Sequence, residues 1–428
     1  MERAAKARHL VAIAIAGQVV AYILSVLAAR RLGVSGFEAY VVASAAFILL
    51  ATFAPRGSEK YALRQLPALL QRADWGRARG LLRFGFQRTL TTALAAAIVV
   101  GAWSAWGRQG AEETRLAIIV TCLSLPAGAL AHYGVEALTA AGRPRLALAI
   151  FKLLVPVLAL TFLGVLFAAP GEVSGAAAVA CWGVAWVVAL AVMALAFRRS
   201  APPAIFAAKP RWDLAVWRAE TRPFFIYRVS LALLGQAGVI ALELLQPSSV
   251  AVGAYAAAMG TVGMASVLAT STNRAYGREL SLVLDRRDFE MLLVLRRRRL
   301  RWMAPVMALF LTVTFGFSAQ VLGLFRPEFA QEGAMALRVL AVSTAFTVLF
   351  SLAPTYLKFQ KRDLATYVVV GAAALGQLVL LWTLVPPYGA TGAAMAYGVS
   401  MCGMYGVFAL LAHREVVTLR DASGPSQS

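Results

Sequence analysis

Charged side chains are scarce in this chain. They make up 14% of its 428 residues, with 41 basic residues against only 20 acidic ones. A soluble globular domain has about 25% charged residues and is roughly half apolar, whereas 60% of this chain is hydrophobic. The shortage of charge leaves little room for a soluble domain and predicts an integral membrane protein.

Cysteine and histidine are also rare in the sequence. The three cysteines lie in apolar segments far apart from one another, and the three histidines do not form a recognisable ligand set. This spacing predicts neither a disulfide framework nor a metal site. Sequence motifs of the P-loop, GxSxG and HExxH types are missing as well. We therefore expect no cofactor, no metal and no catalytic residues, and we do not expect an enzyme.

Long apolar runs are what the sequence contains in abundance. Reading runs of about 20 residues as membrane spans gives twelve, and no stretch between them is long enough for an independent domain. The predicted spans cover 10–29, 36–54, 89–106, 116–137, 146–168, 174–196, 223–245, 249–271, 303–325, 334–357, 364–385 and 390–412. The expected fold class is therefore an all-α membrane protein with twelve transmembrane helices.

Basic residues gather in alternate connecting segments. Most of the 41 Lys and Arg side chains lie before the first span or after every second span. The positive-inside rule then places both termini in the cytoplasm, which requires an even number of spans. This topology also explains the net charge of +21, which in a soluble protein would favour a nucleic-acid partner. No nucleic-acid partner is expected here.

The two halves of the chain share a pattern. Features of the segment 40–83 return in 255–297, where tyrosine, arginine, aspartate and leucine recur in nearly the same order. A repeat at half the length predicts two homologous lobes of six spans, both in the same orientation. We expect an N-lobe at 1–197 and a C-lobe at 223–413, separated by a cytoplasmic connector at 198–222 and followed by a cytoplasmic tail at 414–428.

A segment that mixes apolar and charged residues precedes the ninth span. It covers 281–302 and ends in the basic run 296–301, which is interrupted only by Leu300. Such a pattern fits a helix in the membrane interface, with its arginines near anionic lipid.

Apart from Arg338 at the start of the tenth span, two basic residues fall inside predicted spans. Arg228 lies about five residues into the seventh span, and Lys152 lies about seven residues into the fifth. An ionisable group inside the bilayer costs at least ~2.5–3.5 kcal/mol, so each is a candidate for a functional site. The alternative is that each long side chain reaches back to the membrane surface.

Further polar residues accompany these two cations. Gln18 and Tyr22 lie on one polar stripe of the first span, Gln236 lies near Arg228 in the seventh, and Arg56 flanks the inner end of the second. A stripe of this kind serves helix packing or a water-filled cavity equally well. Because the candidates inside the membrane are mainly cationic, we expect an anionic passenger, with phosphate as the obvious group.

Three short motifs resemble those of one transporter family. The turn RRLGVSGFEAY at 30–40 resembles the pattern RxLGxxxFGxY of the polysaccharide-export branch of the MATE/MOP flippases. The segments 324–329 and 336–340 are similar to that branch's entry to span 10, and 386–395 is similar to its turn into span 12. Together with twelve spans in two halves, the resemblance covers nearly the whole chain. The chain departs from the family's turns at Glu38 and Arg326, where glycine is usual.

The resemblance implies an alternating-access flippase in the bacterial cytoplasmic membrane. Its passenger would be an undecaprenyl-pyrophosphate-linked oligosaccharide for O-antigen, capsule or exopolysaccharide assembly. Membrane lipids and other membrane proteins of polysaccharide assembly would be its partners, and coupling to H⁺ or Na⁺ stays open. The alternatives are a lipid II flippase or a MATE-type drug or cation antiporter of the same superfamily. A polytopic glycan polymerase or ligase is the alternative from another class.

Overall fold

A computed structural model gives the structure of the chain and describes residues 2–107, 112–246, 248–285, 289–360 and 363–422. These residues form helices joined by short turns, and no strand occurs among them. The first half contains α1 (Glu2–Phe53), α2 (Ser58–Gln71), α3 (Trp75–Ala102), α4 (Glu112–Ala140), α5 (Pro144–Ala149), α6 (Val155–Ala168) and α7 (Gly175–Ser200). Two π-helical turns, η1 (Trp103–Gly107) and η2 (Ile150–Leu154), extend α3 and join α5 to α6.

The second half contains the remaining helices. They are α8 (Pro203–Ala207), α9 (Leu214–Leu245), α10 (Ser249–Asp285), α11 (Phe289–Gly316), α12 (Ser318–Gly323), α13 (Pro327–Phe350), α14 (Ala353–Phe359) and α15 (Asp363–Ala422). Over the described residues, nine helices are long and apolar enough to cross a membrane. The chain is thus a multi-pass membrane protein, as its composition predicts.

The twelve predicted spans map onto these helices. α1 holds the first two and bends between them at Gly33, where φ is 75°. α15 holds the last two and bends at Gly389, where φ is 51°. The ninth predicted span, 303–325, covers the second part of α11 and all of α12, and α11 also carries the basic run 296–301. The all-helical architecture expected from the sequence is confirmed.

Several helices are longer than the spans predicted from hydropathy. α9 begins nine residues before position 223, and α10 continues past position 271 to Asp285. The described residues of the interfacial helix predicted at 281–302 belong to the end of α10 and the start of α11, while 286–288 lie outside the described part of the chain. Its place in the membrane interface stays a prediction. Hydropathy detects only the apolar part of a helix, whereas backbone hydrogen bonding continues into the polar segments beyond it.

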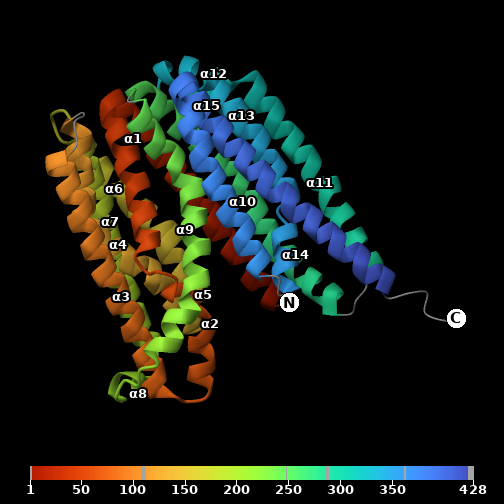
Figure 1. The fold of residues 1–428 in the computed structure, drawn as a ribbon. Coiled ribbons are helices and arrows are strands. Elements are labelled where there is room, and N and C mark those ends of the chain that lie inside the picture. The colour runs from red at the N-terminus through yellow and green to blue at the C-terminus, as the bar shows by residue number, and fades with distance from the viewer. Residues whose placement is uncertain (1, 108–111, 247, 286–288, 361–362, 423–428) are drawn as a thin grey trace.

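The helices form two groups with α1 between them. α3, α4, α6 and α7 lie on one side, and α10 to α15 lie on the other (Figure 1). α1 contacts α4 in the first group and α10 in the second, and it also contacts α9. α1 starts and α15 finishes at the same end of the molecule (Figure 1). This arrangement is compatible with two lobes, while the lobe boundaries at 197, 223 and 413 stay a prediction.

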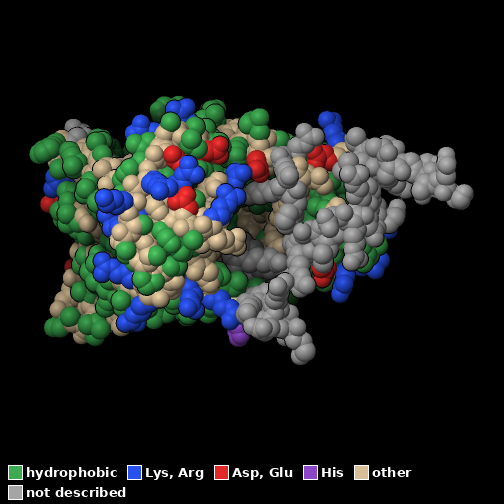
Figure 2. Space-filling view, turned by 90° about the horizontal axis from the view of Figure 1, so that it is seen from below, with side chains coloured by type: hydrophobic (Ala, Val, Ile, Leu, Met, Phe, Trp, Pro, Cys, Tyr) green, Lys and Arg blue, Asp and Glu red, His purple; other side chains and the backbone are tan. Residues whose placement is uncertain are grey.

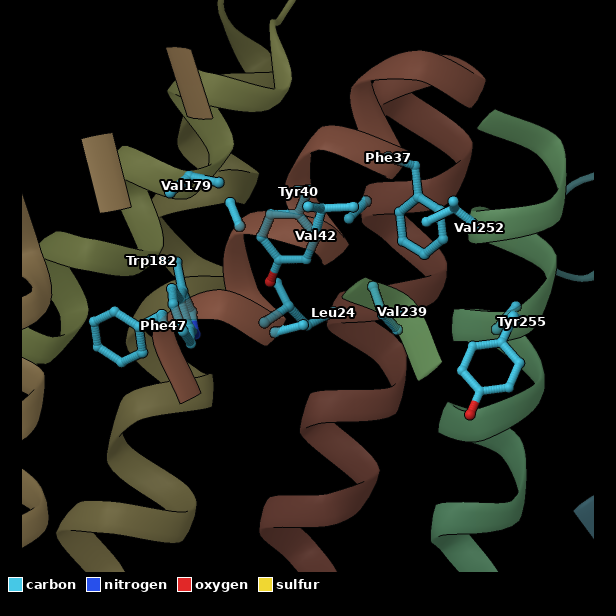
Figure 3. Close-up of a cluster of buried hydrophobic side chains, with 14 of the residues drawn as sticks. Leu24, Phe37, Tyr40, Val42, Phe47, Val179, Trp182, Val239, Val252 and Tyr255 are labelled. Carbon is cyan, nitrogen blue, oxygen red and sulfur yellow. The ribbon is translucent and has the colours of Figure 1, made fainter. Parts of the chain in front are cut away.

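One apolar core continues through both groups of helices. Figure 3 shows part of it around the bend of α1, with Leu24, Phe37 and Tyr40 near Val239 of α9 and Val252 of α10. The Phe37 ring lies 5.8 Å from the ring of Phe329 in α13. The two groups are therefore packed firmly together near Gly33, which is the end that the sequence predicts to face outward.

Candidate functional site

At the opposite end, the turn between α1 and α2 packs directly against α9. Gly57 has a φ of 81°, and a Cβ at this position would overlap the backbone carbonyl of Thr221 and the backbone nitrogen of Phe225. Only glycine fits such a left-handed turn at such a close approach. The ring of Phe53 also lies 5.2 Å from that of Phe225. This contact joins the first half of the chain to the first helix of the second half.

The same contact brings Arg228 to an acidic partner. The Arg228 Nε lies 3.4 Å from the Glu59 Oε1, and the Glu59 side chain is only 1% exposed, against 26% for Arg228. Neither carboxylate oxygen of Glu59 accepts a hydrogen bond from any donor in the described part of the chain. The pair is thus held by charge and burial, without an aligned hydrogen bond. The sequence position of Arg228 does not predict that it lies beside the carboxylate of Glu59.

Burial controls the ionisation of Glu59, which lies in α2 and outside the membrane-spanning helices. Desolvation raises the pKa of Glu59 above its ordinary value of 4.5, and the nearby charge of Arg228 offsets only part of this rise. The folded protein therefore holds a proton on Glu59 more tightly than the unfolded chain does. A proton on Glu59 would remove the charge that faces Arg228.

The raised pKa predicts how stability depends on pH. The contribution of Glu59 is fully present below about pH 4.5, the ordinary pKa of the unfolded chain, and is lost as the pH rises through the higher folded-state pKa. We expect the melting temperature of the purified protein to fall as the pH rises through this range. Glu59→Gln should flatten the dependence, which melting curves at several pH values would reveal. An unchanged pH profile in that variant would contradict the prediction.

Lys152 lies in the π-helical turn η2, where the chain between α5 and α6 widens by one residue. Gly17 of α1 faces this turn so closely that a Cβ would overlap the Lys152 carbonyl oxygen. The Lys152 side chain is exposed, and its Nζ lies 5.7 Å from the centre of the Phe151 ring. π-Helical turns inside helices are frequent at functional sites. Here the turn places a basic side chain beside α1.

His132 of α4 lies beside the η2 turn that carries Lys152. The His132 imidazole is buried and lies edge-on to Phe151 at 4.8 Å, and nearly parallel to Trp186 at 5.6 Å. Arg228 comes from α9 and Lys152 from η2, and α1 packs against both of these elements. The junction between the two groups of helices therefore carries two basic residues, one on each side of α1.

The other predicted site residues lie around this junction in different ways. Gln18 reaches toward α10, because a Cβ on Gly263 would lie 3.3 Å from its Nε2. Tyr22 packs edge-on against Phe325 at 5.4 Å, which indicates a packing role. Gln236 is partly buried two turns beyond Arg228 in α9. Arg56 is exposed and has a left-handed φ of 50°, which is rare for a residue with a side chain. Their role in binding a passenger stays a prediction.

Two neighbours of the predicted site were not predicted from the sequence. Glu59 stands just after a predicted span, so its position does not point to a partner in α9, 169 residues further along the chain. His132 lies inside an apolar segment, where buried packing is the default interpretation. No group of three or more potential metal ligands occurs among the described residues.

Comparison with known proteins identifies the fold. No protein-family model and no curated sequence matches the chain. Among solved structures, an inward-facing multidrug resistance MATE family transporter of the MOP superfamily has 15% identity and a TM-score of 0.63, over 97% of this chain and 96% of that one. The Vibrio cholerae MATE transporter in its bent form has 15% identity and a TM-score of 0.61, over 97% of this chain and 98% of that one.

A third similar structure has been described by the polarity of its pocket. It is a MOP superfamily transporter from Pyrococcus furiosus, in which the reverse polarity of the binding pocket suggests a different function. It has 14% identity and a TM-score of 0.60, over 97% of this chain and 96% of that one. These neighbours are transporters, and the chain has the fold of MOP superfamily transporters.

Proposed function

We propose that this protein is an alternating-access flippase whose passenger is the diphosphate end of a lipid-linked oligosaccharide. The observation that carries the proposal is that two basic residues, Arg228 of α9 and Lys152 of η2, stand on elements that both pack against α1 at the junction of the two helix groups. Phosphate is a strong acceptor for such side chains. The motifs at 30–40, 324–329 and 386–395 support the polysaccharide-export branch and a place in the bacterial cytoplasmic membrane with both termini inside.

The polarity of the site favours an anionic passenger over a cationic drug. A cation antiporter needs carboxylates where its passenger binds, whereas Glu59 is buried against Arg228 and does not stand as an exposed acidic site. Pocket polarity has been used in the same way for the Pyrococcus furiosus neighbour, where its reversal suggests a different function.

Glu59 offers a route for proton coupling. In the ion pair, its carboxylate occupies one side of the Arg228 guanidinium. When Glu59 takes up a proton, the acid becomes neutral, and Arg228 is available to the passenger's diphosphate. Loss of that proton restores the pair and favours release. This exchange supports H⁺ over Na⁺ as the coupling ion.

The test of the proposal is a flipping assay in proteoliposomes. The probe is a fluorescent oligosaccharide on polyprenyl diphosphate, and the readout is its loss of accessibility to a quencher outside the vesicles. We expect Arg228→Ala and Lys152→Ala each to slow flipping by at least about fivefold, because each removes one positive charge from the site that would bind the passenger's phosphate. Arg143→Ala removes an exposed cation elsewhere in the chain and should leave the rate unchanged.

Two passengers separate the proposal from its alternatives. Lipid II tests the related flippase, and ethidium efflux driven by an H⁺ or Na⁺ gradient tests the drug antiporter. Flipping of the oligosaccharide lipid without ethidium efflux supports the proposal. Ethidium efflux without flipping, or flipping that is the same in all three variants, would overturn it.

A further inference from the structure

A second basic site lies beside the junction, between α3 and the start of α9. It is a pocket of about 1000 Å³ that includes four arginines, Arg56, Arg88, Arg218 and Arg222. Neither Arg228 nor Lys152 lines it, and none of its described lining residues is acidic. The other three arginines and the buried carboxylate of Glu59 all lie within electrostatic reach of Arg88. Four cations in a pocket whose own lining has no carboxylate attract an anion.

The pocket is held in shape by contacts among its own elements. The Arg88 Nη1 donates a hydrogen bond of 2.7 Å to the Oγ1 of Thr221, which is fully buried. The Arg88 guanidinium also lies 5.4 Å from the centre of the Phe84 ring. The left-handed turn at Arg56 and Gly57 fixes the third side of the pocket against α9. Arg88 is therefore oriented before any ligand arrives.

The connector closes the remaining side of the pocket. The Arg79 Nη1 donates a hydrogen bond of 2.6 Å to the Ala208 carbonyl, and the Arg211 amide donates one of 2.9 Å to the Gly76 carbonyl. These bonds attach the segment before α9 to the beginning of α3. Trp212, which follows directly, lines the pocket.

The position of the pocket indicates a lipid as its ligand. Its arginines stand where the second, third and seventh predicted spans reach the membrane surface, which is the level of lipid headgroups. Figure 2 shows basic side chains spread over this underside of the first half of the molecule. Phe84, Trp212, Leu214 and Phe225 give the pocket apolar walls as well. Tryptophan beside arginine is typical of a membrane interface.

A path for a lipid chain begins at the pocket. Gln87 and Thr91 of α3 line the pocket, and Leu94 and Ile98 continue the same face of the helix at spacings of three and four residues. Leu94 is 45% exposed and Ile98 is 70% exposed. An acyl or prenyl chain could lie along this stripe while its phosphate occupies the pocket.

We propose that this pocket binds the phosphomonoester or diphosphate end of a membrane lipid. Four arginines carry more charge than one phosphodiester neutralises, so the pocket selects headgroups with two or more negative charges. For polyprenyl diphosphate the proposal rests on the proposed function, since that lipid carries the passenger and Arg56 is shared with the predicted site. Binding can nevertheless be measured without transport.

Native mass spectrometry of the full-length protein in detergent tests the proposal. The probes are phosphatidylcholine, phosphatidylglycerol, phosphatidic acid and polyprenyl diphosphate, with inorganic pyrophosphate as the soluble phosphate. We expect phosphatidic acid and polyprenyl diphosphate to bind at least about tenfold more tightly than phosphatidylglycerol, and phosphatidylcholine to bind most weakly. The double variant Arg88→Gln with Arg222→Gln should bind phosphatidic acid and polyprenyl diphosphate at least about tenfold more weakly than the unchanged protein does.

A charge-matched control separates the pocket from general basicity. Arg72→Gln with Arg143→Gln removes two exposed arginines outside the pocket and should change lipid affinity by less than about twofold. Arg88→Lys with Arg222→Lys keeps the charge, so partial recovery of binding supports the site even if the glutamine variant folds poorly.

Three results would overturn the proposal. One is equal loss of lipid binding in the control and the pocket variants, and another is an absence of preference among the four lipids. The third is pyrophosphate binding as tightly as polyprenyl diphosphate, which would assign the pocket to a soluble phosphate compound. The experiment measures lipid binding and not flipping. Its results can therefore be interpreted even if the proposed transport activity is wrong.

Discussion

Arg299→Ala is expected to lower the free energy of unfolding by about 3–5 kcal/mol. The side chain is 2% exposed, and its guanidinium donates to the carbonyls of Val348 and Leu349, the Asn273 Oδ1 and the Ser351 Oγ. A hydrogen bond from a charged donor contributes roughly 1.5–3 kcal/mol, and a buried acceptor left alone adds its own penalty. Thermal or denaturant unfolding of the purified variant measures the loss.

The neighbouring residue provides the control for this prediction. Arg298 belongs to the same basic run and is exposed, so Arg298→Ala should change the unfolding free energy by less than about 0.5 kcal/mol. Arg299→Lys keeps the charge but presents fewer donors, and its stability should lie between the other two. Equal stability of the Arg298 and Arg299 variants would show that the hydrogen bonds of Arg299 contribute nothing.

Gly57→Ala is expected to lower the free energy of unfolding by about 2–5 kcal/mol. The left-handed backbone costs a residue with a Cβ roughly 1–2 kcal/mol, and crowding a packed contact costs roughly 1–3 kcal/mol more. The added methyl would meet the backbone of α9 at Thr221 and Phe225. Since this turn also places Arg56 and Glu59, transport should fall together with stability, and both can be measured on one preparation.

A substitution at Gly142 separates the cost of the left-handed backbone from the cost of crowding against α9. Its φ is 85°, and a Cβ there would meet no atom within 4 Å. Gly142→Ala therefore carries only the backbone cost of roughly 1–2 kcal/mol. If Gly57→Ala and Gly142→Ala lower the free energy of unfolding equally in the same denaturant series, the contact between the turn and α9 does not contribute to stability.

Apolar periodicity predicts the architecture because a membrane span must satisfy its own backbone hydrogen bonds. The positions of the spans follow from this requirement alone. The bends at Gly33 and Gly389 do not, since two helices that meet at a kink have the same composition as two helices joined by a short loop. Chain length and hydropathy therefore indicate where the chain crosses, and only the structure identifies which successive helices meet at a kink.

The candidate site likewise shows that the sequence predicts which residues are unusual but not which residues they contact. Arg228 and Lys152 were predicted because a charge in the membrane is costly, and that reasoning needs no partner. The partner of Arg228 could not be predicted, because Glu59 reaches it only through the close contact of Gly57 with α9. The basic run 296–301 gives a clearer example. Its pattern predicts contact with lipid, but one of its arginines, Arg299, is buried and donates hydrogen bonds to residues of α10 and α13.

The bends at Gly33 and Gly389 have a mechanical consequence. At each bend two successive helices meet at a kink, and the glycine there is the residue whose backbone dihedrals are not helical. When one of the two helices tilts, the helix that meets it at the kink is expected to tilt with it. α1, which contacts both groups of helices, would carry movement from one group to the other without the slack that a loop would introduce.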